Sequence, residues 1–118
     1  MFEVKLPSGK SIAVKAPSYY DRLETVKEWR KTNGDAGYSA DELMCAKCVV
    51  GVDGNSVNPD MIPDPILILA DWSNQDVQYY MEFFMTAFFL DDKLRERAAN
   101  EAKKLMTGQL TAKTSSKK

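Results

Sequence analysis

Apolar and polar residues alternate at the start of the chain, where residues 2–6 read Phe-Glu-Val-Lys-Leu. Ile12 and Val14 repeat the alternation after residues 7–10, Pro-Ser-Gly-Lys, which have the composition of a tight turn. A period of two is typical of a strand with one buried face. The pattern therefore predicts a β-hairpin over residues 2–15. Because an isolated hairpin is marginally stable in water, we expect one of its faces to pack on helices.

A near capping box and a full capping box mark the starts of the next two helices. Ser18 stands three residues before Asp21, and Ser39 stands three residues before Glu42, so helices are predicted to begin at or just after these serines. The first helix is expected to end at residues 33–34, Asn-Gly. The apolar residues on one side of the first helix are Tyr19, Leu23, Val26 and Trp29, and those on the inner face of the second are Leu43, Ala46 and Val50.

Residues 52–64 contain two Pro, two Asn and a Gly, which predicts the longest surface loop. Gly51 and residues 53–54, Asp-Gly, are expected to close the second helix. A brief strand at residues 49–52 is also expected, just before the loop. Pro65 is a favourable first residue for a helix, because proline is tolerated there. Ser73 is expected to cap the following helix, with Asp76 at its third position, and that helix is predicted over residues 74–89.

A last helix is predicted from residue 91 to about Met106, because acidic residues open it, two lysines close it and Gly108 follows. Residues 109–118 contain three Lys and no acid, and we expect them to form a disordered basic tail. Together the elements predict an α+β fold, in which an N-terminal β-hairpin packs on a bundle of four to five helices. We expect a single globular domain over residues 1–108.

The helix predicted over residues 74–89 is apolar around most of its circumference. Its apolar residues form two stripes on roughly opposite sides: Val77, Tyr80, Met81, Phe84 and Phe88 in one, and Tyr79, Phe83, Ala87 and Leu90 in the other. Such a helix either lies in the centre of the core or offers an apolar face to another chain, and both can hold on different faces. The residues predicted to bind a partner are Tyr79, Tyr80, Phe83, Phe84, Phe88 and Phe89.

No catalytic constellation is recognisable. The 118 residues include no His, which is the usual general base near neutral pH, and no phosphate-binding loop or nucleophile elbow. The acidic residues that could suggest acid–base or metal chemistry lie mostly at predicted helix starts, where capping explains them: Asp64, Asp76, Asp91 and Asp92. We therefore expect no enzyme activity, no catalytic residue and no cofactor.

Cys45 and Cys48 have the spacing of a redox dithiol or of half a zinc site. They lie inside a predicted helix after Asp41 and Glu42, whose negative charges raise the pKa of a thiol rather than lower it. Two thiolates also supply only half of the tetrahedral ligand set of zinc. We interpret both residues as small core residues and expect no metal site, with a small zinc or thiol protein as the alternative.

The charge balance gives no reason to expect a nucleic acid or a membrane as partner. Sixteen basic and 17 acidic residues leave a formal net charge of −1. The longest uninterrupted apolar run, residues 66–70, is much shorter than the roughly 18 residues that a membrane span needs. The first residues also lack the layout of a signal peptide, so the expected location is the cytoplasm of the cell that makes the chain.

Several segments occur in a familiar order: the turn at residues 6–10, Asp21-Arg22, residues 48–54, the helix from Asp76 to Tyr80, and residues 88–92. This order, over roughly residues 2–106, resembles the small tail assembly chaperones of tailed bacteriophages and related baseplate assembly proteins. The resemblance implies a protein that binds the tape-measure protein in the host cytoplasm and keeps it soluble until the tail tube polymerises. A permanent structural component of the virion tail or baseplate is the main alternative, and a homo-oligomer stays open.

Overall fold

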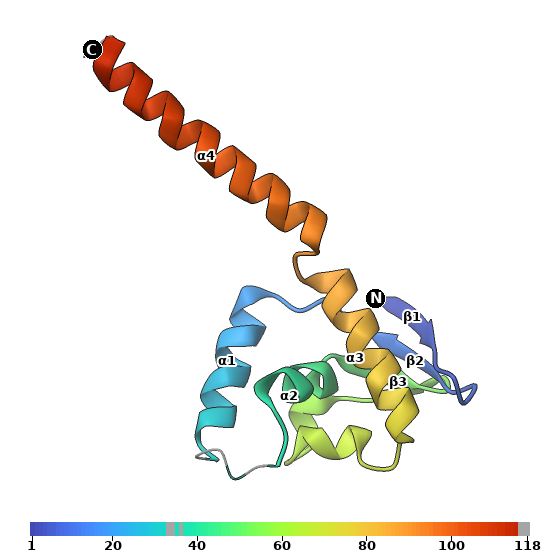
Figure 1. Cartoon of the computed structure of the whole chain (residues 1–118). Helices are drawn as coiled ribbons and strands as arrows, with labels where there is room; N and C mark the ends of the chain where they lie inside the picture. Colours follow the sequence, from blue (N-terminus) through green and yellow to red (C-terminus); the bar gives the residue numbers. More distant parts are fainter. Residues whose placement is uncertain (33–34, 36, 116–118) are drawn as a thin grey trace. The chain divides into compact units, whose positions relative to one another are not determined.

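The predicted hairpin is confirmed in the computed structural model, which describes residues 1–32, 35 and 37–115 (Figure 1). Strand β1, Phe2–Lys5, pairs antiparallel with β2, Ser11–Val14. Strand β2 also pairs with β3, Val49–Val52, which in turn pairs with β4, Asn55–Ser56. The described residues thus form a four-stranded antiparallel sheet in the order β1-β2-β3-β4, and the predicted α+β class is confirmed.

The brief strand predicted at residues 49–52 is confirmed as β3, and it changes the role of its neighbours. Val50 lies in this strand, so its placement on the inner face of the second helix is wrong. Asp53 and Gly54, expected to close that helix, instead form the turn between β3 and β4, with positive φ angles of 49° and 83°. The Asp53 carboxylate accepts a hydrogen bond from the Ser11 backbone N–H at 2.9 Å, which ties this turn to β2.

Both predicted capping boxes are formed. Helix α1, Tyr19–Arg30, starts after the Ser18–Asp21 box, and helix α2, Ala40–Lys47, starts after the Ser39–Glu42 box. In each box the serine hydroxyl accepts from the backbone of the acidic residue, whose carboxylate accepts from the backbone of the serine. The predicted Asn-Gly end of the first helix, at residues 33–34, lies outside the described residues.

The apolar side that the sequence indicates for α1 is only partly covered, since Val26 and Trp29 are half-buried. Thr25 is the buried residue of this helix, whereas Tyr19 is 72% exposed and Leu23 is 51% exposed. The Thr25 hydroxyl donates to the carbonyl oxygen of Asp21 at 2.7 Å and lies 3.7 Å from the sulfur of Met44 in α2. Because this side chain is short and its hydroxyl is satisfied within its own helix, α1 can approach α2 closely.

Between β4 and α3 the chain forms two 3-10 helices, η1, Pro59–Met61, and η2, Pro65–Leu69, within the predicted loop and at the predicted helix start. Helix α3, Asn74–Phe88, begins where predicted, with the Ser73 hydroxyl accepting from the Asp76 backbone N–H at 3.1 Å. The core lies among α2, α3, η2 and one face of the sheet. Its buried apolar residues include Val4, Leu6, Ile12, Val14, Leu43, Val49, Leu69, Trp72, Tyr80 and Phe84.

The chain divides into two compact units, Met1–Phe88 and Phe89–Lys118, where the sequence indicates one domain over residues 1–108. The second unit contains α4, Asp92–Ser115, whose start is capped by the Asp91 carboxylate accepting from the Leu94 N–H at 2.8 Å. The helix continues through Gly108, so the prediction that Gly108 ends it is wrong. Gly108 does not take the positive φ that a glycine at a helix end uses, and its place inside a helix costs about 0.5–1 kcal/mol relative to alanine.

Substitution Gly108→Ala tests this course of the chain. Since alanine is the better residue inside a helix, the variant should show more helical signal by circular dichroism and slower amide exchange near residue 108. The free energy of helix formation is expected to improve by about 0.5–1 kcal/mol. A loss of helical signal would show that Gly108 instead ends the helix in the left-handed conformation, where alanine is strained.

Candidate functional site

Polar contacts to two other elements fix the rotation of α3 about its axis. The buried carboxylate of Asp76 accepts the backbone N–H of Ser8 at 3.1 Å and the Ser8 hydroxyl at 2.5 Å, so the helix start is joined to the hairpin turn. One turn further on, the Tyr80 hydroxyl donates to the carbonyl oxygen of Cys45 in α2 at 2.6 Å. Burial raises the pKa of Tyr80, so the phenol keeps its proton and remains a donor.

Aromatic contacts continue this fixation along the inner side of α3. The ring of Tyr80 lies 5.8 Å from that of Trp72 and 5.9 Å from that of Phe84. The ring of Phe88 lies 5.1 Å from that of Phe84 and 5.3 Å from that of Phe2 in β1. These tilted and edge-on pairs are favourable arrangements of aromatic rings, and they link α3 to the edge of the sheet.

The structure separates the six residues predicted to bind a partner. Tyr80 and Phe84 are 0% exposed and belong to the core, where Tyr80 is hydrogen-bonded to α2 and the ring of Phe84 contacts those of Tyr80 and Phe88. Tyr80 and Phe84 are therefore not part of the candidate partner-binding surface. Tyr79 is 50% exposed although it is the neighbour of Tyr80, since consecutive helical residues point in directions about 100° apart. The other three predicted residues, Phe83, Phe88 and Phe89, are half-buried.

The two stripes expected for this helix are thus an inner and an outer face. The inner face consists of Val77, Tyr80, Met81, Phe84 and Phe88, all of them buried or half-buried. The outer face of α3 consists of Tyr79, Phe83 and Ala87, and it borders an open, mainly apolar hollow of about 390 Å³. Glu82 and Thr86 complete the lining, so one carboxylate accompanies the apolar side chains. Their spacing of three and four residues places them side by side on the helix.

The two cysteines lie in the core, as predicted. Cys45 is 0% exposed and Cys48 is 1% exposed. Burial raises the pKa of both thiols, that of Cys48 to about 11, and the charges of Asp41 and Glu42 raise the pKa of Cys45 further. Thiols of this kind stay protonated near neutral pH and are poor nucleophiles. Within the described part of the chain, no three acidic, cysteine or histidine side chains gather in a way that could hold a metal ion.

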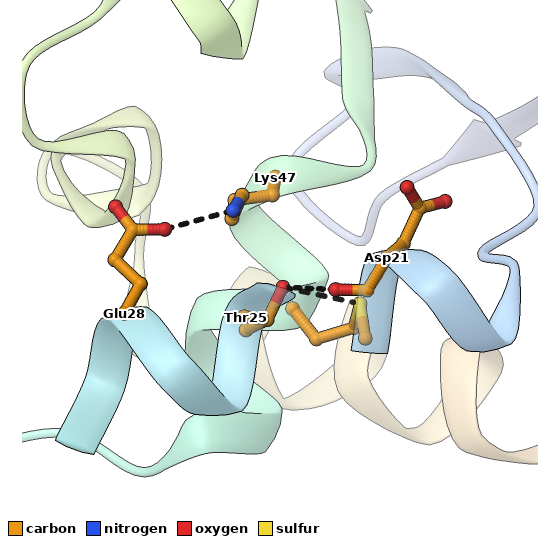
Figure 2. Close-up of polar contacts among 5 residues, drawn as sticks. Asp21, Thr25, Glu28 and Lys47 are labelled. Atoms are coloured by element: carbon orange, nitrogen blue, oxygen red, sulfur yellow. Dashed lines mark hydrogen bonds and ion pairs between the residues drawn. The ribbon is translucent and has the colours of Figure 1, made fainter. Parts of the chain in front are cut away.

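A second hollow, of about 300 Å³, has a mainly polar lining from α1, the end of α2, Lys15 and Asp60. Figure 2 shows the contacts beside it, where Thr25 reaches Asp21 and the Lys47 ammonium lies 2.8 Å from a carboxylate oxygen of Glu28. The backbone N–H of Ser18 lowers the pKa of Asp21, so this carboxylate is already used as a helix cap. These groups join the two helices, and no nucleophile is paired with a base among them.

No protein-family model matches the chain, and neither the curated proteins nor the solved structures contain a significant match. None of the helices in the described part of the chain has the length and apolar character needed to cross a bilayer. The outer face of α3 is the feature of the first unit that most needs a functional explanation, because an exposed apolar surface often marks an interaction site.

The raised thiol pKa values give a testable prediction. At a pH of about 8 the folded protein should react with iodoacetamide much more slowly at Cys45 and Cys48 than the chain unfolded in guanidinium, because both thiols are buried and protonated. Peptide mass spectrometry after timed alkylation measures this. Rapid labelling of either thiol in the folded protein would contradict the core assignment.

The raised pKa of Cys48 also predicts how the free energy of unfolding changes with pH. Between the ordinary thiol pKa of 9.0 and the folded Cys48 value of about 11, the unfolded chain loses a proton that the folded chain keeps. The contribution of Cys48 to the free energy of unfolding is therefore complete below pH 9.0 and is lost as the pH rises through this window. Replacing Cys48 by alanine should make the free energy of unfolding less dependent on pH in that window.

Proposed function

We propose that this chain is a non-enzymatic binding protein that holds an apolar helical segment of another protein on the outer face of α3. The observation that carries the proposal is the open apolar hollow beside Tyr79, Phe83 and Ala87, on a helix whose Tyr80 and Phe84 are already buried in the core. Helices that dock in apolar grooves use anchor side chains at such spacings of three, four and seven residues. A half-exposed Tyr beside a half-buried Phe offers a large contact area with few rotatable bonds.

The bound chain, in this proposal, is the tape-measure protein of a tailed bacteriophage, and binding takes place in the host cytoplasm. The support is the resemblance of residues 2–106 to small tail assembly chaperones, in the order of the hairpin, the capped helices and the aromatic helix. The mechanism is protection: while the apolar segment lies on α3, it cannot aggregate with other copies of the tape-measure protein.

Co-expression tests the proposal directly. The tape-measure protein of the same phage should be more soluble when this chain is produced with it, and Tyr79→Asp should remove most of that effect, because a carboxylate buried in an apolar interface loses its hydration. We expect the affinity to fall by at least about tenfold, which corresponds to roughly 1.4 kcal/mol. Tyr19→Asp on α1 is the matched control, since Tyr19 is 72% exposed and lies outside the hollow.

Two results would count against this function. If the tape-measure protein is equally soluble with and without the chain, there is no chaperone activity. If mass spectrometry finds the chain in purified virions at a fixed copy number, it is a structural part of the tail and not an assembly factor that leaves.

A further inference from the structure

Strand β1 is an outer edge of the sheet, since β2 pairs with one of its sides (Figure 1). Directly after β1, the N–H of Leu6 donates to the carbonyl oxygen of Lys10 at 2.8 Å, on the side of β2. Backbone groups point to alternate sides along a strand, so those of Val4 also point to β2, and those of Glu3 and Lys5 point outward. Among the residues that the structure describes, none is hydrogen-bonded to this outer side. The edge therefore offers backbone donors and acceptors to a further strand.

The side chains of this edge are sorted by face. Val4 and Leu6 are buried on the side of the core, whereas Glu3 and Lys5 are exposed on the opposite side. Phe2 shares the face of Val4 but is 47% exposed, so the apolar face is incompletely covered at this end of the strand. Directly opposed residues of two paired strands lie on the same face of the sheet. A matching strand must therefore bring apolar residues to one face and complementary charges to the other.

Residues 2–6, Phe-Glu-Val-Lys-Leu, match a second copy of themselves. When two copies run antiparallel about a two-fold axis at Val4, Glu3 of each chain stands opposite Lys5 of the other. On the apolar face, Phe2 of each chain stands opposite Leu6 of the other. Opposite charges in directly opposed positions stabilise the pairing of two strands, and so do aromatic residues opposite apolar ones.

The neighbouring registers lack this match. An axis at Glu3 places two carboxylates opposite each other, and an axis at Lys5 places two ammonium groups opposite each other, both of which are unfavourable. A shift by one residue brings the inward backbone groups of one chain opposite the outward groups of the other, so the hydrogen bonds cannot form. Pro7 has no N–H, which ends the ladder of hydrogen bonds after Leu6.

The match points to a second copy and not to another part of the same chain. Strand β1 cannot pair with itself, and the other edge strand, β4, has two residues that carry no charge, Asn55 and Ser56. The described part of the second unit is the helix α4, whose backbone N–H and C=O groups bond to one another within the helix. This choice of partner holds wherever the second unit lies.

We propose that two copies of this chain pair edge to edge through β1, with the two-fold axis at Val4, and join their four-stranded sheets into one continuous sheet. Each opposed Glu3 and Lys5 exchange both of their backbone hydrogen bonds. A lysine on an edge strand normally opposes such pairing, but in this register each Lys5 faces a Glu3. The contact uses no residue of the outer face of α3, so the dimer does not rest on the proposed function.

Reversal of single charges tests the register. The wild-type chain should reach the mass of a dimer in sedimentation equilibrium as its concentration rises. Glu3→Lys and Lys5→Glu should each raise the dissociation constant at least about tenfold, because like charges then stand opposite each other. An equimolar mixture of the two variants should dimerise again, since every basic side chain of one chain then faces an acidic one of the other. A general loss of structure in either variant would not be repaired by mixing.

Glu24→Lys and Lys27→Glu on α1 are the matched controls. Both residues are exposed, and the two variants have the same net charges as the variants of β1. Alone or mixed, they should change the dissociation constant much less, because neither residue belongs to the edge. Equal effects of the α1 and β1 variants would show that net charge alone governs the association, and would overturn the register.

Disulfide formation locates the axis. Val4→Cys places two thiols in directly opposed positions, where the Cα atoms lie about 4.5 Å apart and a disulfide can form. Lys5→Cys is the control, because in this register the two copies of residue 5 lie roughly 8 Å apart, too far for a disulfide. The native cysteines are buried and give little background. Mild oxidation should therefore yield a covalent dimer with Val4→Cys and little with Lys5→Cys, although Lys5 is the more exposed of the two.

Three further results would overturn the proposal. The first is a monomer mass of the wild-type chain at every concentration. The second is a mixture of Glu3→Lys and Lys5→Glu that stays monomeric, or undiminished dimerisation of each variant alone. The third is a disulfide that forms no faster in Val4→Cys than in Lys5→Cys. None of these results bears on the chaperone proposal, since the experiments contain no second protein and leave the outer face of α3 unchanged.

Discussion

The rotation of α3 about its axis is the constraint on which the rest of the structure depends. Asp76 is hydrogen-bonded to Ser8 in the hairpin turn, and Tyr80 is hydrogen-bonded to the carbonyl of Cys45 in α2. Phe84, one turn after Tyr80, is fully buried as well, so these three residues fix one orientation of the helix. Any other rotation would leave the buried carboxylate or phenol without a partner, at a cost of about 1–3 kcal/mol for each group.

That same rotation leaves Tyr79, Phe83 and Ala87 beside the open apolar hollow, because the side of α3 that carries Asp76, Tyr80 and Phe84 is the one packed on the core. The binding proposal follows from this geometry. The buried cysteines contribute to the same core as Tyr80. Their chemistry is suppressed by burial, so they support the fold and do not compete with α3 as a site.

Local signals in the sequence predicted the helices and strands well. They did not predict the contacts between residues that are far apart in the chain. The hairpin, the Ser18 and Ser39 capping boxes and the two stripes of α3 follow from spacing alone, and each is present. The burial of Thr25 did not follow, because it depends on how closely α1 approaches α2. The Ser8–Asp76 contact joins residues 68 positions apart, and nothing local marks it. For Gly108, the local preference of glycine for a helix end was overridden by the helical residues around it.

The most direct test of the account compares two adjacent side chains on α3. Hydroxyl-radical footprinting is done on the chain at a dilution where it is monomeric, and tandem mass spectrometry separates modification of Tyr79 from that of Tyr80. The account predicts that Tyr79 is modified at least about tenfold faster than Tyr80, because the first is 50% exposed and the second is 0% exposed. Equal protection of both rings in the monomer would contradict it, since α3 would then have no outer face to offer.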